Sequence, residues 1–119
     1  MEDLDFTGAN LIESDLGSLQ MRGTKLVGAR LYGADLTLTN LVDADLRQAK
    51  LGMAKLHWTI LDRANLSGAS LVHADLTEAD LMEANLAGAN LRGAKVDDIQ
   101  LAQAKTLKGA TLPGGTVHD

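Results

Sequence analysis

Histidines and acidic residues are the side chains of this chain that could support acid–base or metal chemistry. The three histidines, His57, His73 and His118, fall at unrelated places of the sequence, and none has a partner at the spacing of a metal site. The chain has no cysteine, which excludes a thiolate metal site and a disulfide framework. Its twelve glycines form no Walker or dinucleotide-binding pattern. We therefore predict no catalytic, cofactor-binding or metal-binding residue, and no enzymatic activity.

Composition and charge narrow the remaining classes of protein. The formal net charge of −5 favours solubility and disfavours direct binding to nucleic acid. The opening residues MEDLDFTGAN lack the basic start and apolar run of a secretory signal. No segment approaches the roughly 18–20 consecutive apolar residues that span a bilayer. The expectation is a cytoplasmic protein without membrane contact.

An internal repeat of five residues decides the fold. From Phe6 to Leu101 every fifth residue is apolar, and seventeen of these twenty residues are leucine. Alanine lies two places before this residue in thirteen of the twenty repeats, and Asp or Asn lies between them in eleven. A helix would carry a five-residue stripe around its whole surface, and a flat strand would point alternate leucines to opposite faces. The repeat A-(D/N)-L-x-x therefore predicts neither an ordinary helix nor an ordinary strand.

Three extended residues followed by a two-residue corner satisfy this period. Alanine and leucine then point inward, and the residue between them points outward. The second corner residue is the place for positive φ in a type II turn, and it is glycine at Gly8, Gly23, Gly28, Gly33, Gly68, Gly88 and Gly93.

A second period of twenty residues lies on top of the first. The small inward residues of every fourth repeat match, being alanine at positions 9, 29, 49, 69 and 89. Another set of every fourth repeat has Leu19, Thr39, Thr59, Ala79 and Ile99 at the inward place. Four repeats per coil and about five coils follow, which gives a rod of about 24 Å at the spacing of neighbouring strands.

The repeat, in frame over residues 4–103, resembles the pentapeptide-repeat family, and the tail LKGATLPGGTVHD is similar to the ends of cyanobacterial members. The resemblance implies an all-β, right-handed quadrilateral parallel β-helix. Most members of this family have no assigned function, so the resemblance implies a fold rather than a specific role. A minority of members protect or inhibit DNA gyrase by imitating duplex DNA.

The chain is expected to form a single solenoid over residues 1–119. Residues 1–6 are the predicted N-terminal cap, with Phe6 as an inward plug. After Leu101 the next repeat leucines are Leu107 and Leu112, so one residue is inserted, and we place it near Lys105 or Thr106. Residues 104–119 are then the C-terminal cap, and Pro113 followed by glycine predicts a terminal type II turn.

Charge is unevenly distributed over the four expected faces. The face centred on Leu16 to Val96 has a net charge of −4, the next face −2, and the other two are neutral and +2. A duplex of about 24 Å carries roughly 14 charges, against −6 for the two acidic faces together. The candidate acidic face consists of Asp15, Asp35, Asp75, Glu78, Asp97 and Asp98.

Large apolar residues at outward places are the other candidate. Leu38 and Trp58 occupy the same corner in successive coils, and Ile12, Tyr32 and Val72 form a second outward column. A contiguous exposed apolar patch is typical of a partner site. We predict a non-enzymatic structural or protein-interaction rod with a protein partner, or a homodimer through an end or the Trp58 corner. The alternative is a DNA-duplex mimic that binds or inhibits gyrase, a type II topoisomerase.

Overall fold

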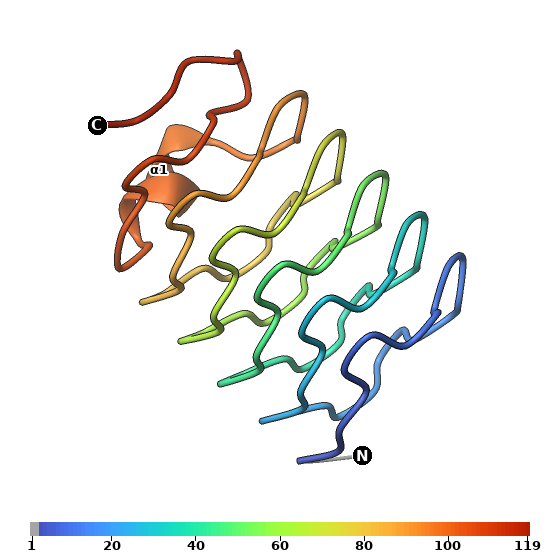
Figure 1. The fold of residues 1–119 in the computed structure, drawn as a ribbon. Coiled ribbons are helices and arrows are strands. Elements are labelled where there is room, and N and C mark those ends of the chain that lie inside the picture. The colour runs from blue at the N-terminus through green and yellow to red at the C-terminus, as the bar shows by residue number, and fades with distance from the viewer. Residues whose placement is uncertain (1–2) are drawn as a thin grey trace.

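The computed structural model describes residues 3–119 as a stack of coils that advances steadily from the N-terminus to the C-terminus (Figure 1). Residues 1–2, the start of the expected N-terminal cap, lie outside the described residues. The molecule measures 35 × 23 × 22 Å. Its long axis exceeds the expected 24 Å because the tail adds further layers beyond the five coils of the repeat.

Neighbouring coils are joined by parallel backbone bridges between residues twenty apart. Arg30 pairs with Lys50, and the same relation holds from Asp5–Lys25 to Asp75–Lys95. In the bridge between Arg30 and Lys50, the backbone of Lys50 both accepts and donates a hydrogen bond. Leu31 N donates to Lys50 O at 2.8 Å, and Lys50 N donates to Ala29 O at 2.9 Å. A parallel ladder with this interval requires four pentapeptides in each coil.

Nearly every corner is a four-residue turn closed by one hydrogen bond. Ala34 N donates to Leu31 O at 3.0 Å, and Gly33, the third residue of the turn, has φ +67°. Every residue at this place from Asp3 to Gly93 has positive φ, twelve non-glycine residues as well as the seven glycines. The left-handed region is costly for residues with a Cβ. The repeat therefore imposes this conformation even where the sequence offers no glycine.

The outward Asp and Asn residues support the same corners. The Asp35 carboxylate accepts a hydrogen bond from Thr37 N at 3.0 Å, and Asn85 does the same for Ala87 N at 3.0 Å. These two-residue bonds are Asx turns, which satisfy a backbone N–H that would otherwise face solvent. The Asp or Asn of the consensus is thus explained by turn geometry alone.

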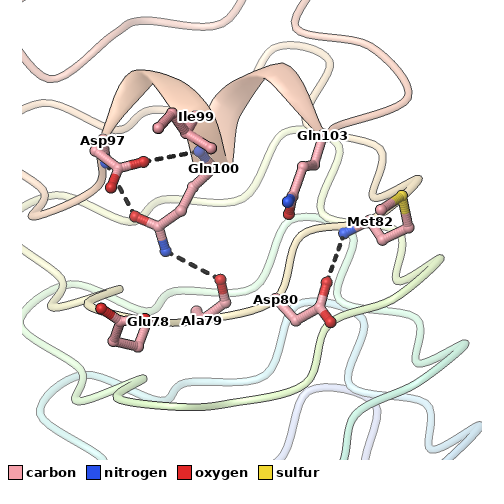
Figure 2. Close-up of a pocket in the computed structure, with 8 residues that line it drawn as sticks. All are labelled: Glu78, Ala79, Asp80, Met82, Asp97, Ile99, Gln100 and Gln103. Atoms are coloured by element: carbon pink, nitrogen blue, oxygen red, sulfur yellow. Dashed lines mark hydrogen bonds between the residues drawn. The ribbon is translucent and has the colours of Figure 1, made fainter.

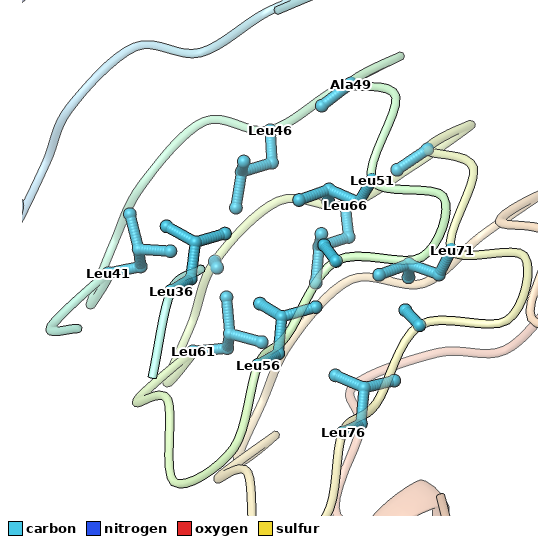
Figure 3. Close-up of a cluster of buried hydrophobic side chains, with 14 of the residues drawn as sticks. Leu36, Leu41, Leu46, Ala49, Leu51, Leu56, Leu61, Leu66, Leu71 and Leu76 are labelled. Atoms are coloured by element: carbon cyan, nitrogen blue, oxygen red, sulfur yellow. The ribbon is translucent and has the colours of Figure 1, made fainter. Parts of the chain in front are cut away.

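The interior is a column of leucines and small residues (Figure 3). Leu36, Leu56 and Leu76 lie above one another with at most 1 % of their surface exposed. Thr39 and Thr59 are also fully buried, and their hydroxyls donate to Leu16 O and Leu36 O at 2.6 and 2.7 Å. The buried threonines are therefore satisfied by the preceding coil, as a buried polar group requires.

One helical turn, α1 (Asp98–Ala102), interrupts the repeat. Bridges change from an interval of 20 at Asp75–Lys95 to 21 at Asn85–Thr106. Glu83 N already donates to Gln103 O, one residue later than the regular pattern. Lys105 N nevertheless donates to Ala84 O at the regular interval of 21, as Lys95 N does to Ala74 O, whereas Leu86 N donates to Thr106 O one residue later than the regular pattern. The regular interval thus resumes at Lys105 after α1, and the lasting shift of one residue begins at Thr106.

Two expectations fail in this segment. The repeat predicts that the side chain of Ile99 points inward, but this residue is 76 % exposed, because the helical turn rotates it away from the core. The chain is also not entirely β. Asp97 caps α1: its carboxylate accepts from Gln100 N at 2.7 Å, while Gln100 Oε1 accepts from Asp97 N at 3.0 Å. This reciprocal capping box fixes the start of the helix.

The tail closes the C-terminal end with a hairpin. His118 N donates to Ala110 O and Gly109 N donates to His118 O, both at 2.8 Å. The turn between the two strands has Leu112 O accepting from Gly115 N at 2.8 Å, and Gly115 has φ +95°. Gly114 does not have positive φ, so the expected type II turn is wrong. Pro113 at the second position of the turn and left-handed Gly115 at the fourth match a type I turn followed by a bulge.

Leu56→Ala is expected to lower the free energy of unfolding by about 2–5 kcal/mol, because it opens a cavity between two coils. Leu56→Asp is expected to prevent folding, because it places an unpaired charge in the column. Lys55→Ala removes an exposed neighbour and is expected to cost less than about 1 kcal/mol. Chemical denaturation followed by circular dichroism measures all three. Equal effects at positions 55 and 56 would contradict the inward–outward register.

The cost of the left-handed corner can be measured at Gly88, where φ is +67° and an added Cβ meets no atom closer than 3.9 Å. Gly88→Ala is expected to destabilise the protein by about 1–2 kcal/mol through backbone strain. Gly114 also has open space around it but lacks positive φ. Gly114→Ala is the matched control and is expected to be neutral or stabilising by up to about 1 kcal/mol. Equal melting temperatures for the two variants would refute the strain.

Candidate functional site

Leu38 and Trp58 occupy the same corner in successive coils and form an apolar corner on the surface. They are 56 % and 54 % exposed. Their backbones are held by the next coil, with Leu38 N donating to His57 O at 2.9 Å and Trp58 N to Thr77 O at 3.1 Å. Both have φ near +60°. Two bulky side chains thus occupy consecutive left-handed corners and project outward from a rigid backbone.

Tyr32 and Val72 lie at a second corner and line a surface depression of about 400 Å³. Tyr32 is 51 % exposed, and Met53 is 50 % exposed beside it. Ile12 belongs to the same column but does not line the depression. The lining residues are Tyr32, Lys50, Gly52, Met53, Ser70, Val72 and His73.

The candidate acidic face is a mixed column rather than an acidic one. Asp15, Asp35 and Asp75 lie in one ladder, but Lys55 lies between the latter two and Lys95 follows Asp75. Hydrogen bonds from Thr37, with a contribution from Lys55, lower the pKa of Asp35. Hydrogen bonds from Thr77 lower the pKa of Asp75, helped by His57 and Lys95. These carboxylates stay ionised, yet their charge is largely neutralised along the column.

Figure 2 shows two of the remaining predicted acidic residues, Asp97 and Glu78, together with α1. Asp97 is the helix cap, Asp98 lies in the first helical turn, and Glu78 faces a groove of about 330 Å³. Gln100 fixes the helix to the preceding coil by donating to Leu76 O at 2.7 Å and Ala79 O at 3.0 Å. Asp97 and Asp98 thus leave the regular ladder, and Asp97 has a structural role. The full lining is Glu78, Ala79, Asp80, Met82, Asp97, Ile99, Gln100 and Gln103.

Asp62 and Asp80 form a carboxylate pair that the sequence pattern does not reveal. Burial and the neighbouring Asp80 carboxylate raise the pKa of Asp62, against a smaller opposing effect of Arg63. In the part of the chain that the structure describes, Asp62 Oδ1 is buried without a hydrogen-bond partner. The pair is eighteen residues apart, so the twenty-residue register does not align it. Its ionisation costs stability rather than supporting acid–base chemistry.

Within residues 3–119 no group of three His, Asp or Glu side chains has the arrangement of a metal site. His57 lies close enough to Asp75 to contribute to its lowered pKa. Over the same residues, no helix has the length and apolar character needed to cross a membrane. Over these residues the geometry offers exposed surfaces for binding.

Comparison with known families now identifies the fold. The family model described as Pentapeptide repeats matches in eight copies, over residues 14–52, 24–63, 39–71 and 59–98. This chain belongs to the pentapeptide-repeat family, as its repeat predicted. Comparison with curated protein sequences found no significant match.

Solved structures of the family align over nearly the whole chain. HetL, involved in the regulation of heterocyst differentiation in the cyanobacterium Nostoc sp. strain PCC 7120, is 34 % identical with a TM-score of 0.70. The alignment covers 96 % of this chain but 64 % of HetL, so the chain spans less than two thirds of that relative. A pentapeptide repeat protein from the thylakoid lumen of Arabidopsis thaliana is 27 % identical with a TM-score of 0.87, covering 98 % and 81 % of the two chains.

A third structure, QnrB1, is a plasmid-mediated fluoroquinolone resistance protein. It is 18 % identical with a TM-score of 0.58, and the alignment covers 96 % of this chain and 62 % of QnrB1. At this identity the likeness shows the fold alone. Together these neighbours imply a right-handed quadrilateral β-helix.

Asp62→Asn is expected to raise the melting temperature at neutral pH. Because the pKa of Asp62 is raised in the folded protein, the contribution of this carboxyl to stability is greatest below its ordinary pKa of 3.8. That contribution is lost as the pH rises through the pKa of Asp62 in the folded state. The difference between variant and parent should therefore shrink on acidification. Asp75→Asn is the matched control, and because the pKa of Asp75 is lowered, its melting temperature should fall at neutral pH. Thermal melts across an acidic-to-neutral series measure both, and a lower melting temperature for Asp62→Asn at neutral pH would contradict the assignment.

Proposed function

We propose that this protein is a non-enzymatic protein-interaction rod whose principal contact is the Leu38–Trp58 corner. The single observation that carries the proposal is that two large, half-exposed apolar side chains occupy the same corner in consecutive coils. Tryptophan is enriched among the residues that dominate binding energies, because it buries a large rigid surface at little entropic cost. We further propose that the protein acts in the cytoplasm.

Backbone strain at this corner supports the proposal. Leu38 and Trp58 have φ of +61° and +58°, where a side chain with a Cβ costs about 1–2 kcal/mol relative to glycine. Glycine occupies the equivalent place in seven repeats, so the fold accepts it readily. Large apolar residues here add exposed surface and strain without adding to the core. A binding contact supplies the compensating benefit.

A DNA-duplex mimic that binds gyrase is the weaker candidate. Duplex DNA carries an unbroken line of negative charge, whereas the column of Asp35 and Asp75 is interrupted by Lys55 and Lys95. The likeness to QnrB1 is a likeness of fold. HetL is involved in the regulation of heterocyst differentiation, and a regulatory role fits a family member that acts by contact, although this chain spans only part of that relative.

Trp58→Ala is expected to leave the melting temperature within a few degrees of the parent and to abolish recovery of the partner. The partner is first identified by cross-linking from a photoreactive amino acid at position 58, in cells of the source organism, and then purified for titration. Glu83→Ala is the matched control, because Glu83 is an exposed left-handed corner residue elsewhere on the rod.

The gyrase-mimic alternative predicts the reverse pattern. Replacing both Asp35 and Asp75 by lysine would abolish binding, Trp58→Ala would matter little, and a supercoiling assay would show inhibition by the parent protein. Homodimerisation through the corner would appear as a change in sedimentation between the parent and Trp58→Ala. Unfolding of Trp58→Ala would show that the side chain covers the coil and would refute its role as a free contact.

A further inference from the structure

Arg30 and Lys50 are paired by a parallel backbone bridge between successive coils. In the part of the chain that the structure describes, this is the only bridge that places two cationic side chains opposite each other. Their neighbours in the column are Asn10 and Ser70, which are uncharged. Like charges directly opposite one another on a sheet are destabilising. Elsewhere the ladder places lysine between carboxylates, as it does for Lys55 between Asp35 and Asp75.

No carboxylate of the described chain neutralises this pair. The ion pairs of residues 3–119 join Arg22 and Arg63 to Asp43, and Arg47 to Asp45. Arg30 and Lys50 are both exposed. The rod is acidic overall, so an isolated pair of cations is a local reversal of charge. A reversal of this kind attracts an anionic partner to one place on the surface.

Lys50 is part of the wall of the depression beside Tyr32, and Arg30 precedes Lys50 in the ladder. Its floor includes the ring of Tyr32, which lies over the backbone of Gly52. A Cβ added to Gly52 would lie 3.1 Å from Cδ2 and 3.4 Å from Cε2 of the ring. Gly52 therefore allows the aromatic ring to lie close to the coil, and Met53 and Val72 extend the apolar surface beside it. Neither aspartate nor glutamate lines the depression.

We propose that this depression binds an extended acidic segment of a partner protein that carries one large apolar side chain. The apolar side chain contacts the Tyr32 ring, Met53 and Val72, while flanking carboxylates pair with Lys50 and Arg30. Charge-assisted hydrogen bonds to these cations would also relieve their mutual repulsion. Two cations are too few to follow a nucleic-acid backbone, whose binding scales with the number of neutralised phosphates.

This site is separate from the Leu38–Trp58 corner and goes beyond the proposed function. The two surfaces lie at neighbouring corners of the same coils, and the column of Asp35, Lys55 and Asp75 runs between them. A partner could engage one surface without the other. Trp58→Ala is therefore a control in the experiment that follows, and failure of either surface can be recognised independently.

The test is a nuclear magnetic resonance titration of the isotope-labelled protein with a short synthetic peptide of glutamates around one phenylalanine. We expect shifts confined to the backbone amides of Tyr32, Gly52, Met53 and their neighbours. A peptide with serine in place of phenylalanine and one with lysines in place of glutamates should bind at least about tenfold more weakly. No local shift at millimolar peptide, or equal shifts with either control peptide, would overturn the proposal.

Substitutions separate the two parts of the site. Tyr32→Ser should weaken binding about tenfold or more, as expected for an aromatic anchor. Lys50→Gln should weaken it about two- to fivefold, the effect of one exposed ion pair. Lys55→Gln removes an equally exposed lysine outside the depression and should leave the affinity unchanged, as should Trp58→Ala. Equal losses for Lys50→Gln and Lys55→Gln would mean that net charge alone attracts the peptide and would refute the site.

A second copy of the chain is the other occupant that the experiment can detect. Without peptide, the amide shifts of Tyr32 and Met53 should not change with protein concentration. Concentration-dependent shifts at these residues, together with faster sedimentation, would show self-association through the depression and overturn the proposal of an acidic partner. Tyr32→Ser retains the backbone ladder, so its circular dichroism spectrum confirms that loss of binding is not loss of fold.

Discussion

The hydrogen-bonded ladder between residues twenty apart is the constraint on which the rest of the structure depends. It fixes the two inward places of each repeat, because every leucine and alanine must fit between identical places in the coils above and below. It also imposes positive φ at every regular corner, even on Trp58 and Glu83. Backbone pairing here outweighs local preference, since about 1–2 kcal/mol per strained corner is opposed by hydrogen bonds and by the burial of a leucine.

The regular coils can be predicted from the sequence because their signal is redundant. Twenty apolar residues at the same interval set the five-residue period, and the matching alanines set four repeats per coil. The segment from Val96 to Leu107 has no such redundancy, because an extra residue can be placed at several points without disturbing either flank. The lasting shift of one residue begins at Thr106, whereas α1 has a separate local cause: Asp97 and Gln100 form a capping box, and Gln100 also bonds the coil beneath. The spacing of Asp97 and Gln100 was a readable signal for this helical turn.

The candidate surfaces were predictable only as far as they follow the ladder. Exposure of Leu38 and Trp58 follows directly from their shared corner. The depression beside Tyr32 depends instead on the direction of the ring over Gly52 and on Lys50 in its wall, neither of which the repeat specifies. Asp62 and Asp80 meet diagonally across coils, so a column-by-column analysis assigns them to separate places.

Binding specificity in this fold must come from departures from the repeat. The consensus residues are committed to the core, the corners and the Asx turns, and they are nearly the same in every coil. Places that vary freely project from a rigid backbone, and those twenty residues apart lie side by side. Two unusual residues in successive coils, such as Leu38 with Trp58 or Arg30 with Lys50, therefore create a preorganised surface without any special loop. Because their backbone is already ordered, a partner that binds them loses little conformational freedom on the side of the rod.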